Sequence, residues 1–94
     1  MITKNTIPVK NPSILCTELD EEAVLLDLNT KCYYGLNEVA LVIWGLIDGV
    51  IKVDGIVENI CSKFDVTPQN AMKSVVRLLE ELNGNKLINF KASV

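Results

Sequence analysis

The stretch that decides the fold is LLDLNTKCYYGLNEVALVIWGLIDG, residues 25–49. It begins as an alternating strand, turns, returns through two adjacent tyrosines, and then becomes a long apolar segment. Asn37 is a residue type that caps helices, and Glu38 places a negative charge in the first turn, where the helix dipole favours it. No charged residue lies between Glu38 and Asp48, so the predicted helix is covered on more than one side.

Short apolar-rich segments separated by turn residues predict a three-stranded antiparallel meander around the start of this stretch. Alternation in the middle strand places Leu25 and Asp27 on one face, opposite Val24 and Leu26. In the third strand Tyr34 and Leu36 share a face, and Tyr33 points the other way. The three predicted strands are residues 14–19, 23–29 and 32–36.

Two more helices are predicted after the apolar one, over residues 54–64 and 67–83. Thr67 is a capping residue, Pro68 suits the first helical position, and Gly84 is placed to end the helix. The main apolar stripe of this last helix is predicted at Ala71, Val75, Leu78 and Leu82, with Met72, Val76 and Leu79 beside it.

Together these elements predict an α+β fold, a small three-stranded antiparallel sheet followed by a three-helix winged-helix-like bundle. Residues 14–90 form the predicted domain, and residues 86–90 are expected to be a short strand or an extended tail. Residues 1–13 contain two prolines and several polar side chains, so we expect a flexible N-terminal arm there.

Composition removes most catalytic and cofactor chemistry. The 94 residues include no histidine, which excludes His-based triads and His metal ligands. The three cysteines are widely spaced, and the five glycines form neither a phosphate-binding loop nor a dinucleotide-binding motif. We therefore expect a protein that is not an enzyme and that holds no cofactor and no metal.

Charge and hydropathy narrow the choice of partner. Nine basic residues are scattered through a chain of net charge −3, which argues against nucleic acid as a partner. No apolar run approaches the roughly 20 residues that span a bilayer, and no signal peptide is recognisable. Hydrophobic residues make up 49% of the chain, enough to leave apolar surface for a protein or peptide partner. We expect a soluble cytoplasmic binding protein with no membrane contact.

Residues 25–49 resemble the PqqD-like family, the small leader-peptide-binding proteins also called RiPP recognition elements, where RiPP denotes a ribosomally made, post-translationally modified peptide. The resemblance extends over residues 14–90. Two departures are Lys31, where the family has a turn glycine, and Ser74, where an aspartate is frequent. The residues that carry the resemblance are Leu25, Leu26, Asp27, Thr30, Tyr33, Tyr34, Leu36, Asn37, Glu38, Ile43, Trp44, Asp48 and Gly49.

The resemblance implies that the chain binds the leader part of a precursor peptide. The leader would add as a strand to the third strand, lie in a groove against the third helix, and be presented to a modifying enzyme such as a radical SAM enzyme, a protease or a cyclase. Apolar anchoring is expected from Met72 and Val76, and attraction of acidic residues from Lys73 and Arg77. The residues expected to contact the peptide are Lys31, Cys32, Tyr33, Tyr34, Gly35, Met72, Lys73, Val76 and Arg77.

Two other interpretations remain open from the sequence. The trihelical plan also suits a DNA-binding winged helix, whose recognition helix would be residues 67–83. That helix carries two acidic residues beside its two basic ones, so it is a poor phosphate binder. The chain could also be a small subunit that is permanently bound to a larger enzyme.

Overall fold

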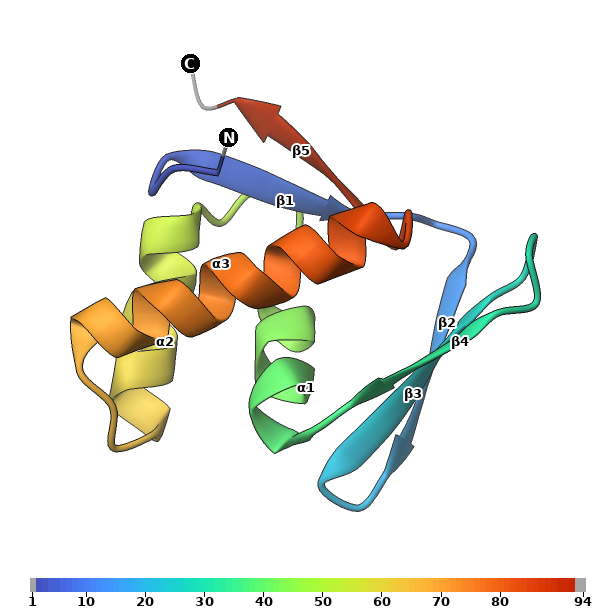
Figure 1. Ribbon diagram of the computed structural model, residues 1–94, viewed down its shortest axis with the longest axis horizontal. Coiled ribbons are helices and arrows are strands. Elements are labelled where there is room, and N and C mark those ends of the chain that lie inside the picture. The colour runs from blue at the N-terminus through green and yellow to red at the C-terminus, as the bar shows by residue number, and fades with distance from the viewer. Residues whose placement is uncertain (1, 93–94) are drawn as a thin grey trace.

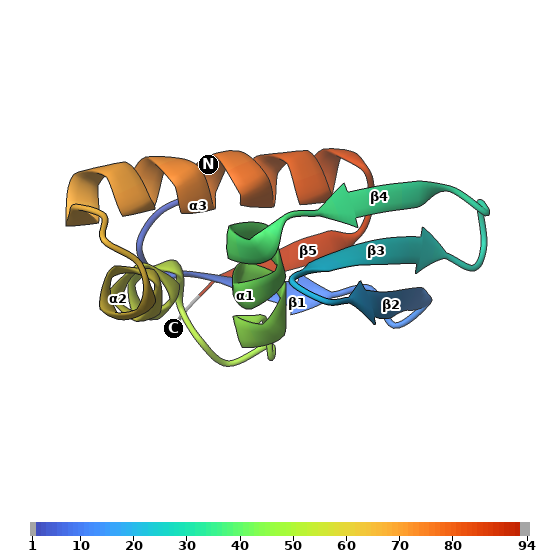
Figure 2. The same cartoon turned by 90° about the horizontal axis from the view of Figure 1, so that it is seen from below.

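The computed structural model describes residues 2–92 and contains two antiparallel sheets and three helices (Figure 1). One sheet has the strand order β2-β3-β4, and the other pairs β1 with β5. Figure 2 shows α3 along one side of the molecule, with α1, α2 and the β1-β5 pair on the other side. The elements are β1 (Thr6–Lys10), β2 (Ile14–Leu19), β3 (Glu22–Asp27), β4 (Tyr33–Leu36), α1 (Glu38–Leu46), α2 (Val53–Lys63), α3 (Pro68–Gly84) and β5 (Ile88–Ala92).

The predicted meander is confirmed as β2, β3 and β4. Leu25 lies opposite Tyr34, and Ala23 lies opposite Leu36. Ala23, Leu25 and Leu36 are buried, so this is the face that the sheet turns toward the helices. Asp27 is also buried, and its Oδ1 accepts the N–H of Asn29 at 2.9 Å. The carboxylate therefore shapes the turn that leads from β3 into β4.

The N-terminal segment differs from the predicted flexible arm, because residues 6–10 form β1 and pair with β5. The N–H of Asn11 donates to the Leu87 carbonyl at 3.0 Å, in register with the same ladder. Hydrogen-bonded pairs alternate along an antiparallel ladder, so Pro8 falls at a position whose nitrogen points away from β5. Proline is tolerated at such positions. Pro8 therefore fits the strand, and Pro12 follows its end.

β5 follows α3 closely and makes the C-terminal segment a strand, one of the two outcomes predicted for it. The α+β prediction is confirmed, but the strands form two sheets rather than the single predicted one. The backbone of the N-terminal segment also reaches α2, where the N–H of Asp54 donates to the Lys4 carbonyl at 3.0 Å. The winged-helix-like description remains a prediction.

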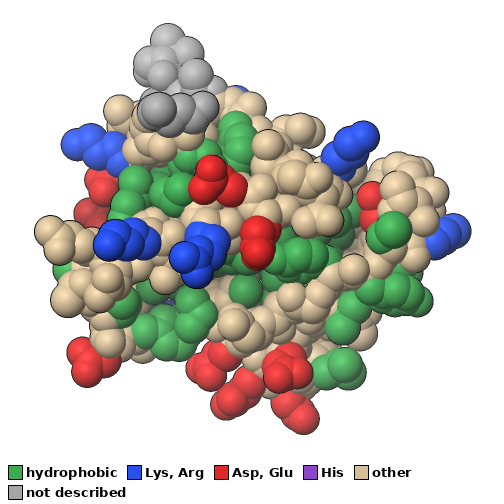
Figure 3. Space-filling model, viewed as in Figure 1, with side chains coloured by type: hydrophobic (Ala, Val, Ile, Leu, Met, Phe, Trp, Pro, Cys, Tyr) green, Lys and Arg blue, Asp and Glu red, His purple; other side chains and the backbone are tan. Residues whose placement is uncertain are grey.

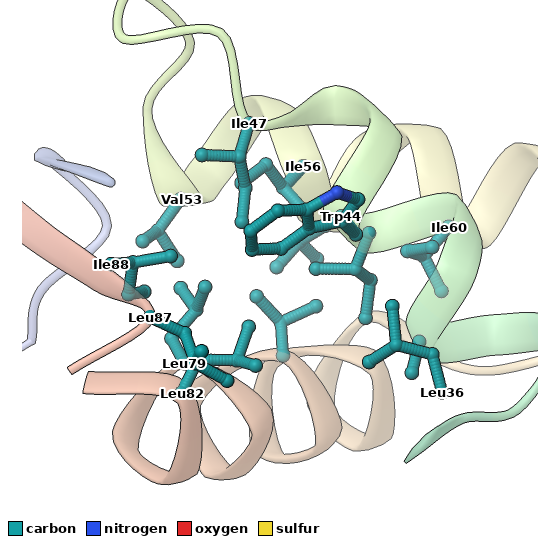
Figure 4. Close-up of a cluster of buried hydrophobic side chains, with 14 of the residues drawn as sticks. Leu36, Trp44, Ile47, Val53, Ile56, Ile60, Leu79, Leu82, Leu87 and Ile88 are labelled. Carbon is teal, nitrogen blue, oxygen red and sulfur yellow. The ribbon is translucent and has the colours of Figure 1, made fainter. Parts of the chain in front are cut away.

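The core forms where α1 meets the other helices and the inner face of the β2-β3-β4 sheet. Asn37 caps α1 as predicted, and its Oδ1 accepts the N–H of Ala40 at 2.9 Å. Ile43 and Trp44 are buried, and Figure 4 shows Trp44 within a cluster that also includes Leu36 and Leu79. Ala40, Ile43 and Trp44 form the buried face of α1, whereas Leu41, Val42 and Leu46 are half-buried, so the helix is less enclosed than its lack of charge predicts.

Two predicted details of α3 are wrong. The buried residues of α3 are Ala71, Val75, Leu79 and Leu82, whereas Leu78 is only half-buried. Leu78 and Leu79 are adjacent and both apolar, so the sequence alone does not decide between them. The helix also continues through Gly84 and ends at the cap Asn85, and Lys86 takes the left-handed conformation with φ of 62°. Thr67 caps the start as predicted, accepting the Asn70 N–H at 3.2 Å.

Replacing Lys31 tests the turn before β4. Lys31 has φ of 64°, a conformation that costs a side-chain-bearing residue about 1–2 kcal/mol. Glycine removes that cost but loses about 0.5–1 kcal/mol of backbone entropy. We expect Lys31→Gly to raise the free energy of unfolding by about 0.5 kcal/mol, measured by denaturant titration. Lys31→Ala keeps the strain and should give no gain; an equal gain from both variants would contradict this explanation.

Candidate functional site

β4 is an edge strand, with β3 on one side and no strand on the other among residues 2–92. The N–H of Asp27 donates to the Cys32 carbonyl at 3.0 Å, which fixes the alternation of the ladder. It follows that Tyr34 and Leu36 bond to β3, whereas Tyr33 and Gly35 turn their N–H and C=O groups to the free edge. Four backbone groups thus face outward, the arrangement that accepts an added strand.

A groove of about 560 Å³ lies between α1 and α3 and opens beside Asn37, the residue that follows β4. Its apolar lining comes from Val39, Ala40, Ile43 and Leu78, and its charged lining from Lys73, Arg77 and Glu81. Figure 3 shows basic and then acidic side chains following the line of α3, with apolar atoms below them. The groove therefore combines an apolar floor with charged groups along one wall.

Tyr34 connects β4 to α3 at one end of this groove. Its hydroxyl donates to Oε2 of Glu81 at 2.7 Å, a contact between residues 47 positions apart. Burial, followed by the hydrogen bond and the negative charge of Glu81, raises the pKa of Tyr34 to about 12. Tyr34 therefore stays a neutral donor at physiological pH and links the edge strand to the helix beside it.

The structure brings together part of the predicted contact set. Cys32, Tyr33 and Gly35 are exposed on or next to β4, and Lys31 is exposed in the turn before it. Tyr33 stands out, with 74% of its surface exposed. On α3, the predicted basic residues Lys73 and Arg77 line the groove.

The predicted apolar anchors Met72 and Val76 do not line this groove. Both are half-buried on the other side of the buried stripe of α3. Glu80, one turn after Val76, instead lines a hollow with Phe90 of β5. At about 100° per residue, positions 72 and 76 point away from positions 74 and 78. The flank of α3 that faces this groove is therefore the one that carries Ser74 and Leu78, and peptide contact by Met72 and Val76 stays a prediction.

Two groove residues were missed in the sequence. Leu78 is half-buried and lines the groove, so it offers an apolar surface on the flank of α3 that faces the groove. Glu81 continues the four-residue spacing of Lys73 and Arg77, and that periodicity is the signal that could have identified it. Its bond to Tyr34 joins two elements and leaves no trace in local sequence.

The sheet has a second free edge at β2, whose outward backbone groups include those of Cys16 and Glu18. A second hollow of about 530 Å³ lies beside it, with Trp44 and Lys10 in its wall. The ammonium of Lys10 lies 4.8 Å from the centre of the Trp44 ring, a cation–π contact. Any experiment on strand addition must therefore distinguish β4 from β2.

Two features are absent from residues 2–92. No group of three or more His, Cys, Asp or Glu side chains is arranged to hold a metal ion. None of the helices described has both the length and the apolar character needed to cross a bilayer.

Comparisons with known proteins agree on one family. The family model for coenzyme PQQ synthesis protein D (PqqD) matches residues 22–88, from β3 to the start of β5. A solved structure described as TbiB1 in complex with the TbiA(beta) leader peptide is 27% identical, with a TM-score of 0.81, covering 90% of this chain and 99% of that one. Lasso peptide synthetase B1 complexed with the leader peptide is 26% identical, with a TM-score of 0.72, covering 87% and 96%. No curated protein sequence matches.

The bond between Tyr34 and Glu81 predicts an unusual titration. In a Tyr33→Phe variant Tyr34 is the only tyrosine, and its absorbance should titrate near pH 12. Because the folded pKa lies above the ordinary value of 10.0, this group stabilises the fold fully below about pH 10 and loses that contribution as the pH rises toward 12. Circular dichroism at each pH confirms that the fold persists during the titration.

Two glutamates provide the matched control for that titration. Glu81→Gln removes the negative charge beside the phenol, so the midpoint should fall, although burial keeps part of the rise. Glu80→Gln makes the same change of charge one residue away, but Glu80 has no hydrogen bond to Tyr34. This variant should leave the midpoint of the Tyr34 titration unchanged. Equal midpoints in the two variants would show that the bond does not form in solution.

Proposed function

The chain belongs to the coenzyme PQQ synthesis protein D (PqqD) family, and on that premise we propose that it binds the leader peptide of a ribosomally made precursor and presents the precursor to a separate modifying enzyme. The observation that carries the proposal is the free edge of β4 beside a groove along α3. The two solved relatives, each described as a complex with a leader peptide, support it.

Strand addition to β4 supplies part of the binding energy. The outward N–H and C=O groups of Tyr33 and Gly35 offer four hydrogen bonds, each worth about 0.5–1.5 kcal/mol net. They sum to about 2–6 kcal/mol before the cost of ordering the peptide, whereas micromolar binding needs about 8 kcal/mol. Backbone pairing alone is therefore insufficient.

The apolar floor of the groove supplies the remainder. A guest side chain that covers the half-buried Leu78 and Val39 removes apolar surface from water, at about 25 cal/mol per Å². Burying roughly 150 Å² in this way contributes about 4 kcal/mol, which brings the binding energy to about 6–10 kcal/mol before the cost of ordering the peptide.

The short length of the site explains how the bound precursor can be presented to the modifying enzyme. β4 has four residues, so a paired guest segment of similar length extends over only about 13 Å. The rest of the precursor lies outside the protein and stays accessible to an enzyme. Radical SAM enzymes, proteases and cyclases are the enzyme classes that we propose as partners, and the chain itself contributes binding rather than catalysis.

Amide hydrogen exchange measured by NMR tests strand addition residue by residue. The probe is the synthetic leader segment of the precursor peptide encoded beside this chain. In the free protein, the N–H groups of Tyr34 and Leu36 are already bonded to β3, whereas those of Tyr33 and Gly35 face solvent. We expect the peptide to slow exchange at Tyr33 and Gly35 and to leave Tyr34 and Leu36 almost unchanged, because only the outward groups gain partners.

The second free edge provides the internal control. The N–H groups of Cys16 and Glu18 face outward on β2 in the same way. Protection at these two residues, with none at β4, would move the binding site to β2 and contradict the proposal. Absence of any protection at saturating peptide would contradict strand addition altogether.

Paired substitutions on α3 test the groove. Leu78→Asn replaces an apolar wall of the groove, and we expect it to weaken leader binding at least about tenfold, equivalent to about 1.4 kcal/mol. Val76→Asn makes a comparable change on the opposite flank of the same helix and should change affinity less than about twofold. Isothermal titration measures both, and thermal unfolding confirms that both variants fold. A larger loss from Val76→Asn than from Leu78→Asn would refute this location.

A further inference from the structure

Three charged side chains follow one line along the groove wall formed by α3. Lys73, Arg77 and Glu81 are spaced four residues apart, and all three line the groove. Four residues of an α-helix rise about 6 Å, so the line extends over about 12 Å. Its order along the helix is positive, positive, negative, as the row of side chains in Figure 3 illustrates.

These charges are not paired with one another. A basic and an acidic residue four positions apart on a helix commonly form an ion pair. Here the Glu81 carboxylate instead accepts the Tyr34 hydroxyl at 2.7 Å. Within residues 2–92, neither Lys73 nor Arg77 forms an ion pair, and both are exposed. Two cations and one oriented anion therefore face the groove.

The spacing of this line matches the spacing of a strand. Alternate residues of an extended peptide lie about 6.8 Å apart on the same face, against about 6 Å for one step along the helix line. Over three positions the mismatch reaches only about 1.6 Å, which the flexible side chains of lysine and arginine can absorb. Three alternate guest residues can therefore face Lys73, Arg77 and Glu81 in turn.

The arrangement also has a direction. Figures 1 and 2 show β4 and α3 running in opposite directions. Tyr34 meets Glu81 at one end of the groove, whereas Asn37 and Asn70 line the other. All strand pairs in this protein are antiparallel, and antiparallel pairing is slightly the more stable per residue. A guest antiparallel to β4 runs along α3 in the same direction, with its earlier residues facing Lys73.

We propose that the groove selects leader segments with the charge pattern acidic-x-acidic-x-basic, read from the amino end of the segment. This inference rests on the proposed function and names the class of peptide that the site prefers. The two acidic residues face Lys73 and Arg77, and the basic residue faces Glu81. A carboxylate has about four lone-pair sites, so Glu81 accepts from a guest lysine or arginine while it holds Tyr34.

A displayed peptide library tests the charge pattern. The probe is the leader segment of the precursor encoded beside this chain, with three alternate positions randomised among aspartate, serine and lysine. Sorting for binding to the full chain should enrich aspartate at the first two positions and lysine at the third. Exposed ion pairs are weak, so we expect about a two- to fivefold preference at each position. The preference should diminish at 1 M salt, where the Debye length is about 3 Å.

Three variants separate this inference from simpler explanations. Glu81→Lys should reverse the preference at the third position from lysine to aspartate, while Glu80→Lys, with the same change of charge on the other flank of α3, should not. Tyr34→Phe breaks the hydrogen bond but keeps the Glu81 charge, so it should keep the lysine preference.

The outcomes are distinguishable. This inference would be overturned by binding that shows no charge preference or the reversed pattern, or by a Glu81→Lys variant that keeps the lysine preference at the third position. Each of these results would leave leader binding intact. Absence of binding by every member of the library, including the native segment, would instead overturn the proposed function on which it rests.

Discussion

Enclosure of α1 is the constraint on which the rest of the structure depends. A helix with no charge between Glu38 and Asp48 must be covered by the sheet on one side and by other helices elsewhere. Among residues 2–92 no strand pairs with the outer edge of β4, and the chain passes from β4 into α1 through Asn37. The same packing places α3 across α1, and the groove remains where α3 and α1 diverge beside that unpaired edge.

The parts of the fold that local sequence determines were predictable. Alternation grouped Leu25 with Asp27 and Leu36 with Tyr34 on shared faces, and side-chain chemistry identified Asn37 as a cap. β1 was missed because its partner β5 lies some eighty residues later, and no local pattern records that pairing. The prolines of the segment argued against a strand, although Pro8 occupies the one kind of ladder position that tolerates it.

The candidate site was predictable to the extent that it belongs to single elements. β4 and the basic residues of α3 follow from periodicity and from the family resemblance. The flank that faces the groove depends on how α3 is rotated about its axis, and one residue corresponds to about 100° of rotation. Assigning Leu78 to the core and Val76 to the groove reversed that rotation. The contact between Tyr34 and Glu81 could not be read from sequence, since it depends on two elements meeting in space.

That contact also explains how a small protein can offer a binding site with little reorganisation. An edge strand and a helix joined only by the core can shift relative to each other, and a guest would then have to order both. The bond between Tyr34 and Glu81 joins β4 to α3 before any guest arrives, so part of that ordering is already complete in the free protein. Because the Tyr34 hydroxyl keeps its proton up to high pH, the connection persists under physiological conditions. In the binding mode that we propose, the backbone edge supplies sequence-independent affinity, the wall of α3 supplies selectivity, and the two contributions act at a fixed separation.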